Sequence, residues 1–156
     1  MVIRQAVVSD LEVLFTHRLE FLKDMRNHEI TISEEFKQHT YEHLREHMED
    51  GTMAVWLAEN REKIISTAII SYYQILPTLS NPSGKCGYVQ NVYTCPEYRR
   101  KGIATRLLNR MLEDARDHNV GRVYLSATDM GKPVYQQLGF EPLTNDMAYQ
   151  IAQRLL

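Results

Sequence analysis

The chain is poor in cysteine, in long apolar runs and in net charge, and each shortage excludes a class of protein. Its two cysteines, Cys86 and Cys95, are too few for a disulfide framework and cannot form a metal site by themselves. No apolar run approaches the ~18 residues of a membrane span, and residues 1–6 lack the apolar core of a signal peptide. A formal net charge of -2 gives no basic field for nucleic acid. We therefore expect a cytoplasmic protein with reduced cysteines that binds neither membranes nor nucleic acid.

Glycine is also scarce, with seven residues in 156. A nucleotide-hydrolysing P-loop needs a glycine, four further residues and then Gly-Lys-Ser/Thr, and no segment fits that pattern. A dinucleotide-binding turn needs three closely spaced glycines. The segment with the clearest anion-binding pattern contains only Gly102. The two common nucleotide loops are therefore excluded.

What the chain does have is the size and apolar content of one domain. At 156 residues and 44% hydrophobic, it can bury a core of its own, so we expect residues 1–156 to form a single domain. Charge is unevenly spread: residues 1–51 hold 11 Asp/Glu against 6 Lys/Arg, a net of -5, which leaves +3 for residues 52–156. The acidic part either faces a cationic partner or forms a solvated helix surface.

Hydrophobic periodicity and turn residues predict the order of elements. In the first part we expect a strand, two helices and the two strands of a hairpin, at 2–7, 11–26, 33–50, 52–59 and 63–76. In the second part we expect a strand, a helix, a strand, a short helix and a last strand, at 88–94, 102–118, 122–128, 133–138 and 148–151. Only the second part contains strand–helix–strand units. The prediction is an α/β fold of mixed (α+β) type, with a central mixed β-sheet flanked by helices.

The most informative segment joins three cations to a helix start. Arg99, Arg100 and Lys101 run directly into Gly102, and an amphipathic helix begins almost at once. A helix start leaves its first N–H groups without intrahelical partners and carries the positive end of the helix dipole. A glycine lets the backbone approach a ligand closely. Together these features predict an anion site, most often one for phosphate.

The context of this segment supports a family resemblance. Residues Arg99 to Ala104 fit the pattern Arg/Gln-x-x-Gly-x-Gly/Ala, after a strand and at the opening of a helix. About thirty residues on comes the segment Tyr135-Gln-Gln-Leu-Gly-Phe140. With these motifs the chain resembles the GNAT superfamily of N-acetyltransferases, which use acetyl-coenzyme A. The resemblance follows the order of elements over nearly the whole chain and is specific from about residue 88 to 140. It implies a GNAT-like fold and an acyltransferase with acetyl-CoA as co-substrate and no metal.

The resemblance also implies roles for single residues. A strand edge would pair with the pantetheine arm and hold the acetyl carbonyl, and a loop would bind the diphosphate through successive main-chain N–H groups. Tyr135 matches the tyrosine proposed to protonate the leaving thiolate. The asparagine usual in the short helix is missing, and Thr128 or Asp129 would take its place. The implied cofactor-binding residues are Val92, Tyr93 and Thr94 on the strand and Arg99, Arg100, Lys101, Gly102, Ile103, Ala104 and Thr105 in the loop.

The general base is the point where this chain departs from the family pattern. Direct attack of an amine on the thioester requires that the amine lose a proton. Many relatives carry a glutamate on the strand before the loop, but the matching positions here are Tyr88 and Gln90, and neither side chain is a base at neutral pH. Either the amine binds already neutral, or its proton passes through water to a more distant group. The open alternatives for that group are a histidine, Glu20, Asp24 and Glu29.

Two other functions are carried as alternatives. Residues 39–47 contain His-x-x-Glu-His twice, with His39, His43 and His47 on one helix face. This is the inverted zinc-protease pattern and suggests a metal-dependent hydrolase using His43, Glu46 and His47. The interpretation preferred to this one is that the histidines form the polar margin of a helix, and a third is that the helix flanks an acceptor pocket. Because the strand glutamate is missing, a non-catalytic CoA-binding regulatory module is the other alternative.

The acceptor cannot be identified from the residues, and the expected partner is a small-molecule or peptide amine. The acidic first third favours a cationic acceptor. Dimers are common in families of this kind, so a homodimer is also expected, although no residue of this sequence establishes one.

Overall fold

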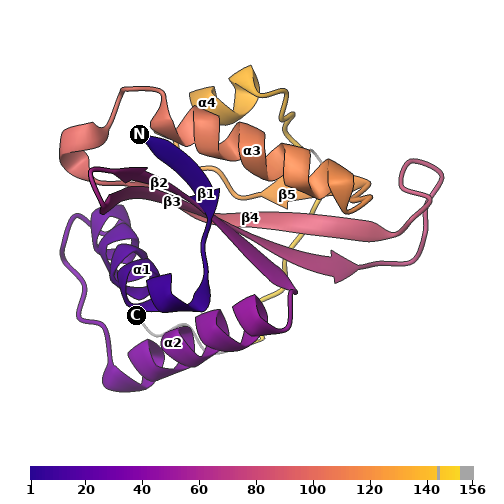
Figure 1. Cartoon of the computed structure of the whole chain (residues 1–156). Coiled ribbons are helices and arrows are strands. Elements are labelled where there is room, and N and C mark those ends of the chain that lie inside the picture. Colours follow the sequence, from indigo (N-terminus) through magenta and orange to yellow (C-terminus); the bar gives the residue numbers. More distant parts are fainter. Residues whose placement is uncertain (144, 152–156) are drawn as a thin grey trace. The chain divides into compact units, whose positions relative to one another are not determined.

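The computed structural model describes residues 1–143 and 145–151. Five strands form one sheet in the order β1-β2-β3-β4-β5 (Figure 1). The first four pair antiparallel, whereas β4 and β5 pair parallel, so the mixed sheet predicted from the sequence is confirmed. The strands are β1 (Val2–Gln5), β2 (Met53–Asn60), β3 (Lys63–Gln74), β4 (Lys85–Thr94) and β5 (Arg122–Leu125).

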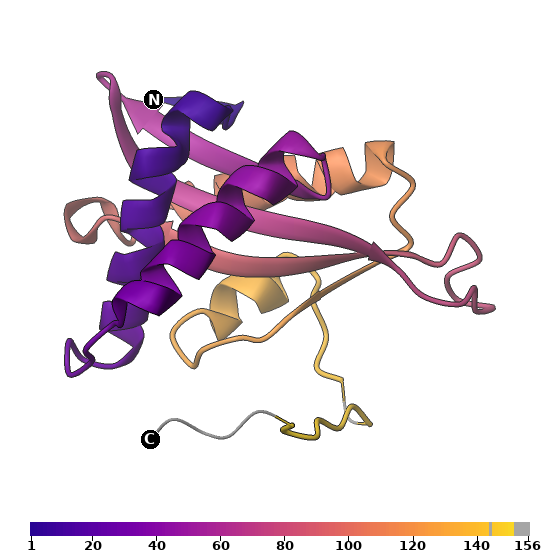
Figure 2. The same cartoon turned by 90° about the horizontal axis from the view of Figure 1, so that it is seen from below.

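The helices lie close to the predicted ranges. Helices α1 and α2 cover one face of the sheet, and α3 covers the opposite face (Figures 1 and 2). Two short 3-10 turns precede α1 and α3. The elements are η1 (Val8–Asp10), α1 (Leu11–Met25), α2 (Glu34–Glu49), η2 (Pro96–Tyr98), α3 (Ile103–Asp117) and α4 (Lys132–Gln137).

The chain divides into two compact units, residues 1–126 and the residues from Ala127 onward. The first unit contains the whole sheet together with α1, α2 and α3, and the second contains α4. The single domain expected over residues 1–156 stays a prediction.

The predicted last strand at 148–151 is wrong. Residues 145–151 form no helix or strand. Met147, Tyr149 and Ile151 are each at least 90% exposed, so this alternating apolar pattern has no face buried against a neighbour. The strand expected at 122–128 also stops early, at Leu125. Alternation alone predicts an extended strand, but a strand forms only where another strand pairs with it.

Two layers of apolar side chains hold β3 and β4 in the middle of the first unit. On one face, α1 and α2 bury leucines against the sheet, in a cluster of Leu11, Leu14, Leu44, Met53, Val55 and Ile69. On the other face, α3 buries Ile103, Leu107, Leu108, Met111 and Ala115, which recur at helical spacing. The start of α3 is therefore fixed beside the end of β4. Within the described residues, no helix is long and apolar enough to cross a membrane.

Candidate active site

Strand β4 changes its pairing along its length. Its first half pairs with β5, from Cys86 opposite Arg122 to Val89 opposite Leu125. Strand β5 then ends, while β4 continues to Thr94 and stays paired with β3. In the part of the chain that the structure describes, residues 90–94 therefore have a strand neighbour on one side only. An edge of this kind can pair its N–H and C=O groups with an extended ligand.

A β-bulge lies in this one-sided half of β4. Tyr93 is paired with Thr67 and Gln90 with Ile69, so Asn91 and Val92 together oppose the single residue between those two on β3. Asn91 has φ 53°, in the left-handed region, and its side chain is 5% exposed. A bulge bends the strand and changes the direction of its polar groups, and bulges are over-represented beside active sites. No motif in the sequence singles out Asn91, and the one signal for it is that asparagine tolerates left-handed backbone better than most residues.

The loop after β4 leaves a group of backbone donors without acceptors. Arg100 has φ 60° and Gly102, the residue that caps α3, has φ 72°. Within the described residues, the N–H groups of residues 100–105 donate to no protein atom, and the first bonded one is that of Arg106, to Gly102 O at 3.2 Å. No side chain caps α3, and its first turn contains no acidic residue. Left-handed residues next to a helix start form a concave nest of N–H groups that binds anions.

The side chain of Arg99 braces this loop against its neighbours. Its guanidinium forms an ion pair with Asp24 of α1, and its Nε donates to Thr94 O at 2.9 Å. The guanidinium also lies 5.8 Å from the centre of the Tyr93 ring. Arg99 therefore links the end of β4 to α1, and its charge is already paired with a carboxylate.

The other two cations of the loop differ from each other. Lys101 Nζ donates to Glu97 O at 2.9 Å and lies 5.3 Å from the centre of the Tyr98 ring. Arg100 is exposed, and its guanidinium bonds to no described residue. The structure thus brings the predicted loop residues together, with backbone N–H groups and Arg100 as the groups left for an anion.

On the α1 side of β4 the structure places a buried histidine. His17 is 6% exposed, and its Nδ1 lies 3.3 Å from Thr67 Oγ1. Its Nε2 lies 3.8 Å from Cys95 Sγ, and its ring lies 5.0 Å from that of Tyr93. Burial lowers the pKa of His17, with a smaller contribution from the charge of Lys63, so the imidazole is neutral at pH 7. Burial also raises the pKa of the Cys95 thiol, which keeps it protonated.

The carboxylates considered as possible general bases differ in whether they form ion pairs. Glu20 forms an ion pair with Lys23 at 2.7 Å, and Asp24 is paired with Arg99. Glu29 is exposed beyond the end of α1. On β4, Gln90 Nε2 donates to Ser71 Oγ at 2.7 Å. Tyr88 is 38% exposed. The choice of base among these groups stays open.

In the second unit, Tyr135 lies on α4. Its ring makes an edge-to-face contact with Phe140, with the ring centres 5.9 Å apart, and its backbone carbonyl accepts from Phe140 N at 3.0 Å. Thr128 Oγ1 accepts from Gly131 N at 3.1 Å just before the helix. Burial raises the pKa of Tyr135, so its phenol keeps its proton at neutral pH and can donate it. Its catalytic role stays a prediction.

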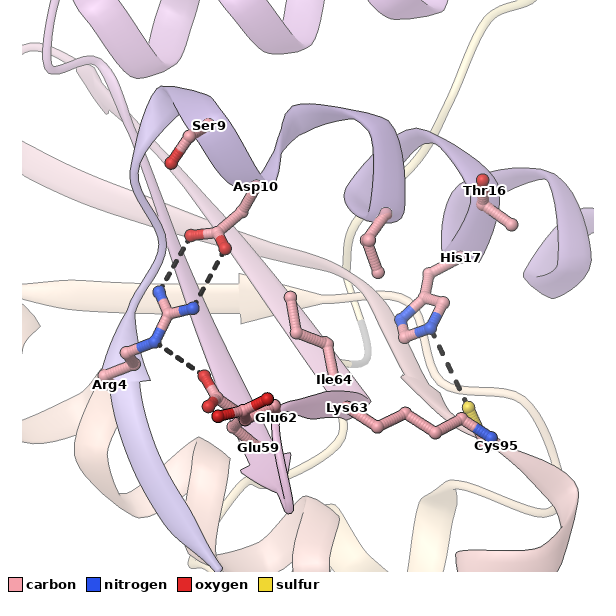
Figure 3. A pocket seen from close by; sticks show the side chains of 11 residues that line it. Arg4, Ser9, Asp10, Thr16, His17, Glu59, Glu62, Lys63, Ile64 and Cys95 are labelled. Atoms are coloured by element: carbon pink, nitrogen blue, oxygen red, sulfur yellow. Dashed lines mark hydrogen bonds and ion pairs between the residues drawn. The ribbon is translucent and has the colours of Figure 1, made fainter.

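A separate cleft of about 660 Å³ lies between β1, the start of α1 and the β2–β3 hairpin (Figure 3). Arg4 crosses one side of it and is paired with Asp10 at 2.8 Å and Glu59 at 3.1 Å. His17 and Cys95 line its other side. None of the loop residues 99–105 and none of residues 92–94 line this cleft, so it is not the predicted donor site.

The histidines of α2 are arranged as a helix margin. The rings of His43 and His47 are 4.2 Å apart, and His47 Nδ1 lies 2.7 Å from Thr52 Oγ1. Across residues 1–143 and 145–151, no group of three or more His, Cys, Asp or Glu side chains is placed to hold a metal ion. The hydrolase alternative therefore has no support in the described part of the chain.

Comparison with known proteins agrees with this geometry. The model of the acetyltransferase (GNAT) family matches residues 19–140. A thialysine N-epsilon-acetyltransferase from Bos taurus is 28% identical over 79 residues, which cover 49% of this chain and 46% of that protein, so the match spans less than half of the bovine enzyme.

Two solved structures are similar over nearly their whole length. A predicted acetyltransferase with acetyl-CoA from Clostridium acetobutylicum has a TM-score of 0.88, 29% identity and 96% coverage of each chain. A GCN5-related N-acetyltransferase from Ralstonia eutropha JMP134 has a TM-score of 0.82 and 26% identity, with 97% of this chain and 99% of that one covered. The predicted fold is confirmed, and the chain belongs to the acetyltransferase (GNAT) family.

Proposed function

We propose that this protein is an N-acetyltransferase that transfers the acetyl group of acetyl-CoA directly to a primary amine. The observation that carries the proposal is the pairing of two features at one place. The bulged half of β4 has a free edge, and the following helix α3 starts with N–H groups that no described residue uses. Membership of the acetyltransferase family supports it further.

The donor site follows from these two features. The amide groups of the pantetheine arm would pair with the edge of β4 at Val92, Tyr93 and Thr94. The diphosphate would lie over the N–H groups of residues 100–105, where the positive end of the α3 dipole and the Arg100 charge favour an anion. The N–H groups around the bulge would hold the acetyl oxygen, which becomes an oxyanion in the reaction.

The reaction needs two proton movements besides the transfer itself. The amine nitrogen bonds to the thioester carbonyl carbon, and the C=O electron pair moves to oxygen. When the C=O bond re-forms, the C–S bond breaks and the sulfur leaves with its electron pair. The sulfur takes a proton from Tyr135, whose raised pKa keeps that proton available at pH 7. The nitrogen gives up its proton to solvent or to one of the open base alternatives.

Calorimetry with coenzyme A tests the donor site directly. We expect saturable binding. The absence of any heat of binding at millimolar coenzyme A would contradict the proposal. Thiol release from acetyl-CoA with a panel of amines then tests the transfer. The panel should include thialysine, because the bovine relative is named for it, together with a polyamine, an amino sugar, free amino acids and a peptide amino terminus. Binding without thiol release would favour the non-catalytic module.

Replacing Tyr135 by phenylalanine tests its part in the mechanism. We expect kcat to fall by at least about 100-fold, the low end of what general acid catalysis contributes, with an unchanged Kd for coenzyme A. Because the pKa of Tyr135 is raised above its usual value, wild-type turnover should lose its acid only at strongly alkaline pH. The Tyr135→Phe variant should lack that alkaline decline. Tyr149→Phe, at an exposed tyrosine of the same unit, is the matched control. Equal turnover of both variants would remove Tyr135 from the mechanism.

Location, assembly and domain structure complete the proposal. Cys86 and Cys95 are both free in the structure, which suits a reducing compartment such as the cytoplasm. We also propose a homodimer and one domain over residues 1–156. Sedimentation of the purified chain measures the first, and a single cooperative unfolding transition would support the second.

A further inference from the structure

Helix α1 carries a cation, Arg18, that no carboxylate of the described residues neutralises. Arg18 is half-buried, and its NH1 donates to Asn91 Oδ1 at 3.3 Å. No carboxylate among the described residues lies within ion-pair distance of its guanidinium. Burial also lowers the pKa of Arg18, as expected for a charge removed from water without an anion beside it. Because burying a charge is costly unless it is paired, this arrangement calls for a function.

The partner of Arg18 is itself incompletely bonded. Asn91 Nδ2 is buried and has no hydrogen-bond partner in the described part of the chain. Asn91 is only 5% exposed, so this amide lies among protein atoms. Nearly all buried polar groups in proteins are bonded, so an open amide donor beside an unpaired guanidinium marks a place for an acceptor of hydrogen bonds.

Both groups lie at the bulge of β4. Asn91 is the first bulge residue, and in the proposed function the N–H groups around this bulge hold the acetyl oxygen. Arg18 approaches from α1, which covers the face of the sheet opposite α3 (Figure 2). The proposed donor site uses the edge of β4 and the start of α3, which leaves the α1 side of the bulge, with Arg18 and Asn91, for the acceptor.

We propose that Arg18 and Asn91 bind a carboxylate of the acceptor, so that the substrate is a free amino acid and not a polyamine or an amino sugar. The inference rests on the proposed function. A guanidinium offers several N–H donors in a planar fork that matches the two oxygens of a carboxylate, and the Asn91 amide adds a further donor. The two carboxylates on this side of β4 do not oppose such binding, since Glu20 is paired with Lys23 and Asp24 with Arg99. An amino acid with a basic side chain also meets the preference for a cationic acceptor that the acidic first third suggests.

Pairs of acceptors that differ only by a carboxylate test this proposal. L-lysine and cadaverine form one pair, and L-ornithine and putrescine form another. We expect kcat/KM for the better amino acid to exceed that of its decarboxylated partner by at least about 10-fold, the discrimination expected when a site built for a polar group meets an analogue lacking it. Substituting Arg18→Gln should raise KM for the amino acid by about 10-fold or more and leave that of the diamine unchanged.

Three variants and one binding measurement separate recognition from a structural effect. Arg26→Gln, at an exposed arginine at the end of the same helix, is the matched control and should change neither KM. If Arg18→Gln does not fold, Arg18→Lys keeps the charge but loses the fork and should still raise KM for the amino acid. The Kd of coenzyme A, measured by calorimetry, should stay the same in all variants.

Three outcomes would overturn the proposal. Diamines that react as well as the amino acids would exclude carboxylate recognition. An equal rise of KM for the amino acid and for the diamine in Arg18→Gln would exclude it as well. Acetylation of neither class by a protein that binds coenzyme A would also overturn it, while leaving the donor site standing. Absence of coenzyme A binding would contradict the proposed function itself, which is a separate result.

Discussion

The helices α2 and α3 begin in opposite ways. At the start of α2, Ser33 Oγ accepts a hydrogen bond from Phe36 N at 3.2 Å, and Glu34 and Glu35 lie in the first turn. At the start of α3 no side chain accepts from the backbone, no acidic residue lies in the first turn, and three cations precede it. The start of α2 is capped by a side chain of its own helix region, whereas the start of α3 leaves its N–H groups and the positive end of its dipole available to a ligand.

A glycine with positive φ lies beside each helix, at the end of α2 and at the start of α3. Gly51 follows the end of α2 with φ +76°, and Gly102 caps the start of α3 with φ +72°. A Cβ at either position would meet nothing within 4 Å. The two glycines are therefore alike in conformation and in the space around them, and they differ in what the backbone beside them can bind. This makes Gly51 a matched control for Gly102.

The largest expected effect comes from substituting each of these glycines by valine. Both variants should lose about 1–2 kcal/mol of unfolding free energy, because a β-branched residue is strained at positive φ. Gly102→Val should also weaken coenzyme A binding by about 100-fold, the loss of about two charge-assisted hydrogen bonds, while Gly51→Val should leave the Kd unchanged. Urea unfolding and calorimetry measure the two quantities. Equal Kd values for the two variants would show that the α3 start does not bind the diphosphate.

A smaller effect should follow from giving α3 the acidic first turn that α2 has. Thr105→Glu places a carboxylate at the third helical position, where it can accept from the N-cap N–H and oppose the dipole. We expect unfolding free energy to rise by about 0.3–1 kcal/mol. Coenzyme A affinity should fall by about 10-fold, since the new charge competes with the diphosphate for the same N–H groups. The coenzyme A affinity of the neutral variant Thr105→Gln should lie between those of the wild type and Thr105→Glu. Tighter binding in Thr105→Glu would contradict the comparison.

The sequence was sufficient to predict both helix starts, because each has a local signature. Ser33 before two glutamates is a capping pattern, and Arg99 to Ala104 is a short motif whose effect depends on its own backbone. The hairpin of β2 and β3 could be predicted for the same reason, since its strands and its turn are adjacent in sequence. These elements follow from interactions between residues near one another in the chain.

The features that the sequence could not predict depend on distant neighbours. The bulge at Asn91 exists only in register with β3, and Arg18 reaches Asn91 from a helix 73 residues away in the chain. The expected strand at 148–151 has an apolar alternation but no partner strand among the described residues. Such features depend on strand pairing and on charge compensation between residues that are distant in the sequence. Hydrophobic periodicity carries no information about either.

Removing the cap of α2 should affect stability alone. Ser33→Ala deletes the oxygen that accepts from Phe36 N, so we expect a loss of about 1 kcal/mol in unfolding free energy. The Kd of coenzyme A should not change, because this helix start makes no part of the proposed donor site. Urea unfolding measures the first quantity and calorimetry the second. A loss of coenzyme A affinity in Ser33→Ala would mean that the two helix starts are not independent.

The smallest effect should come from the one loop cation whose side chain bonds to no described residue. Arg100 is exposed and has φ 60°, and Arg61, in the β2–β3 turn, is exposed with φ 50°, so the backbone cost of a substitution is similar at both sites. Arg100→Gln should weaken coenzyme A binding by about three- to fivefold at low salt, near the ~1 kcal/mol of a solvent-screened charge pair, and Arg61→Gln should not. The difference should shrink as salt is raised to ~1 M, where the screening length falls to about 3 Å. A loss of coenzyme A affinity that does not change with salt would mean that Arg100 acts by holding the backbone of the loop. The start of α3 would then depend on a side-chain contact, as the capped start of α2 does.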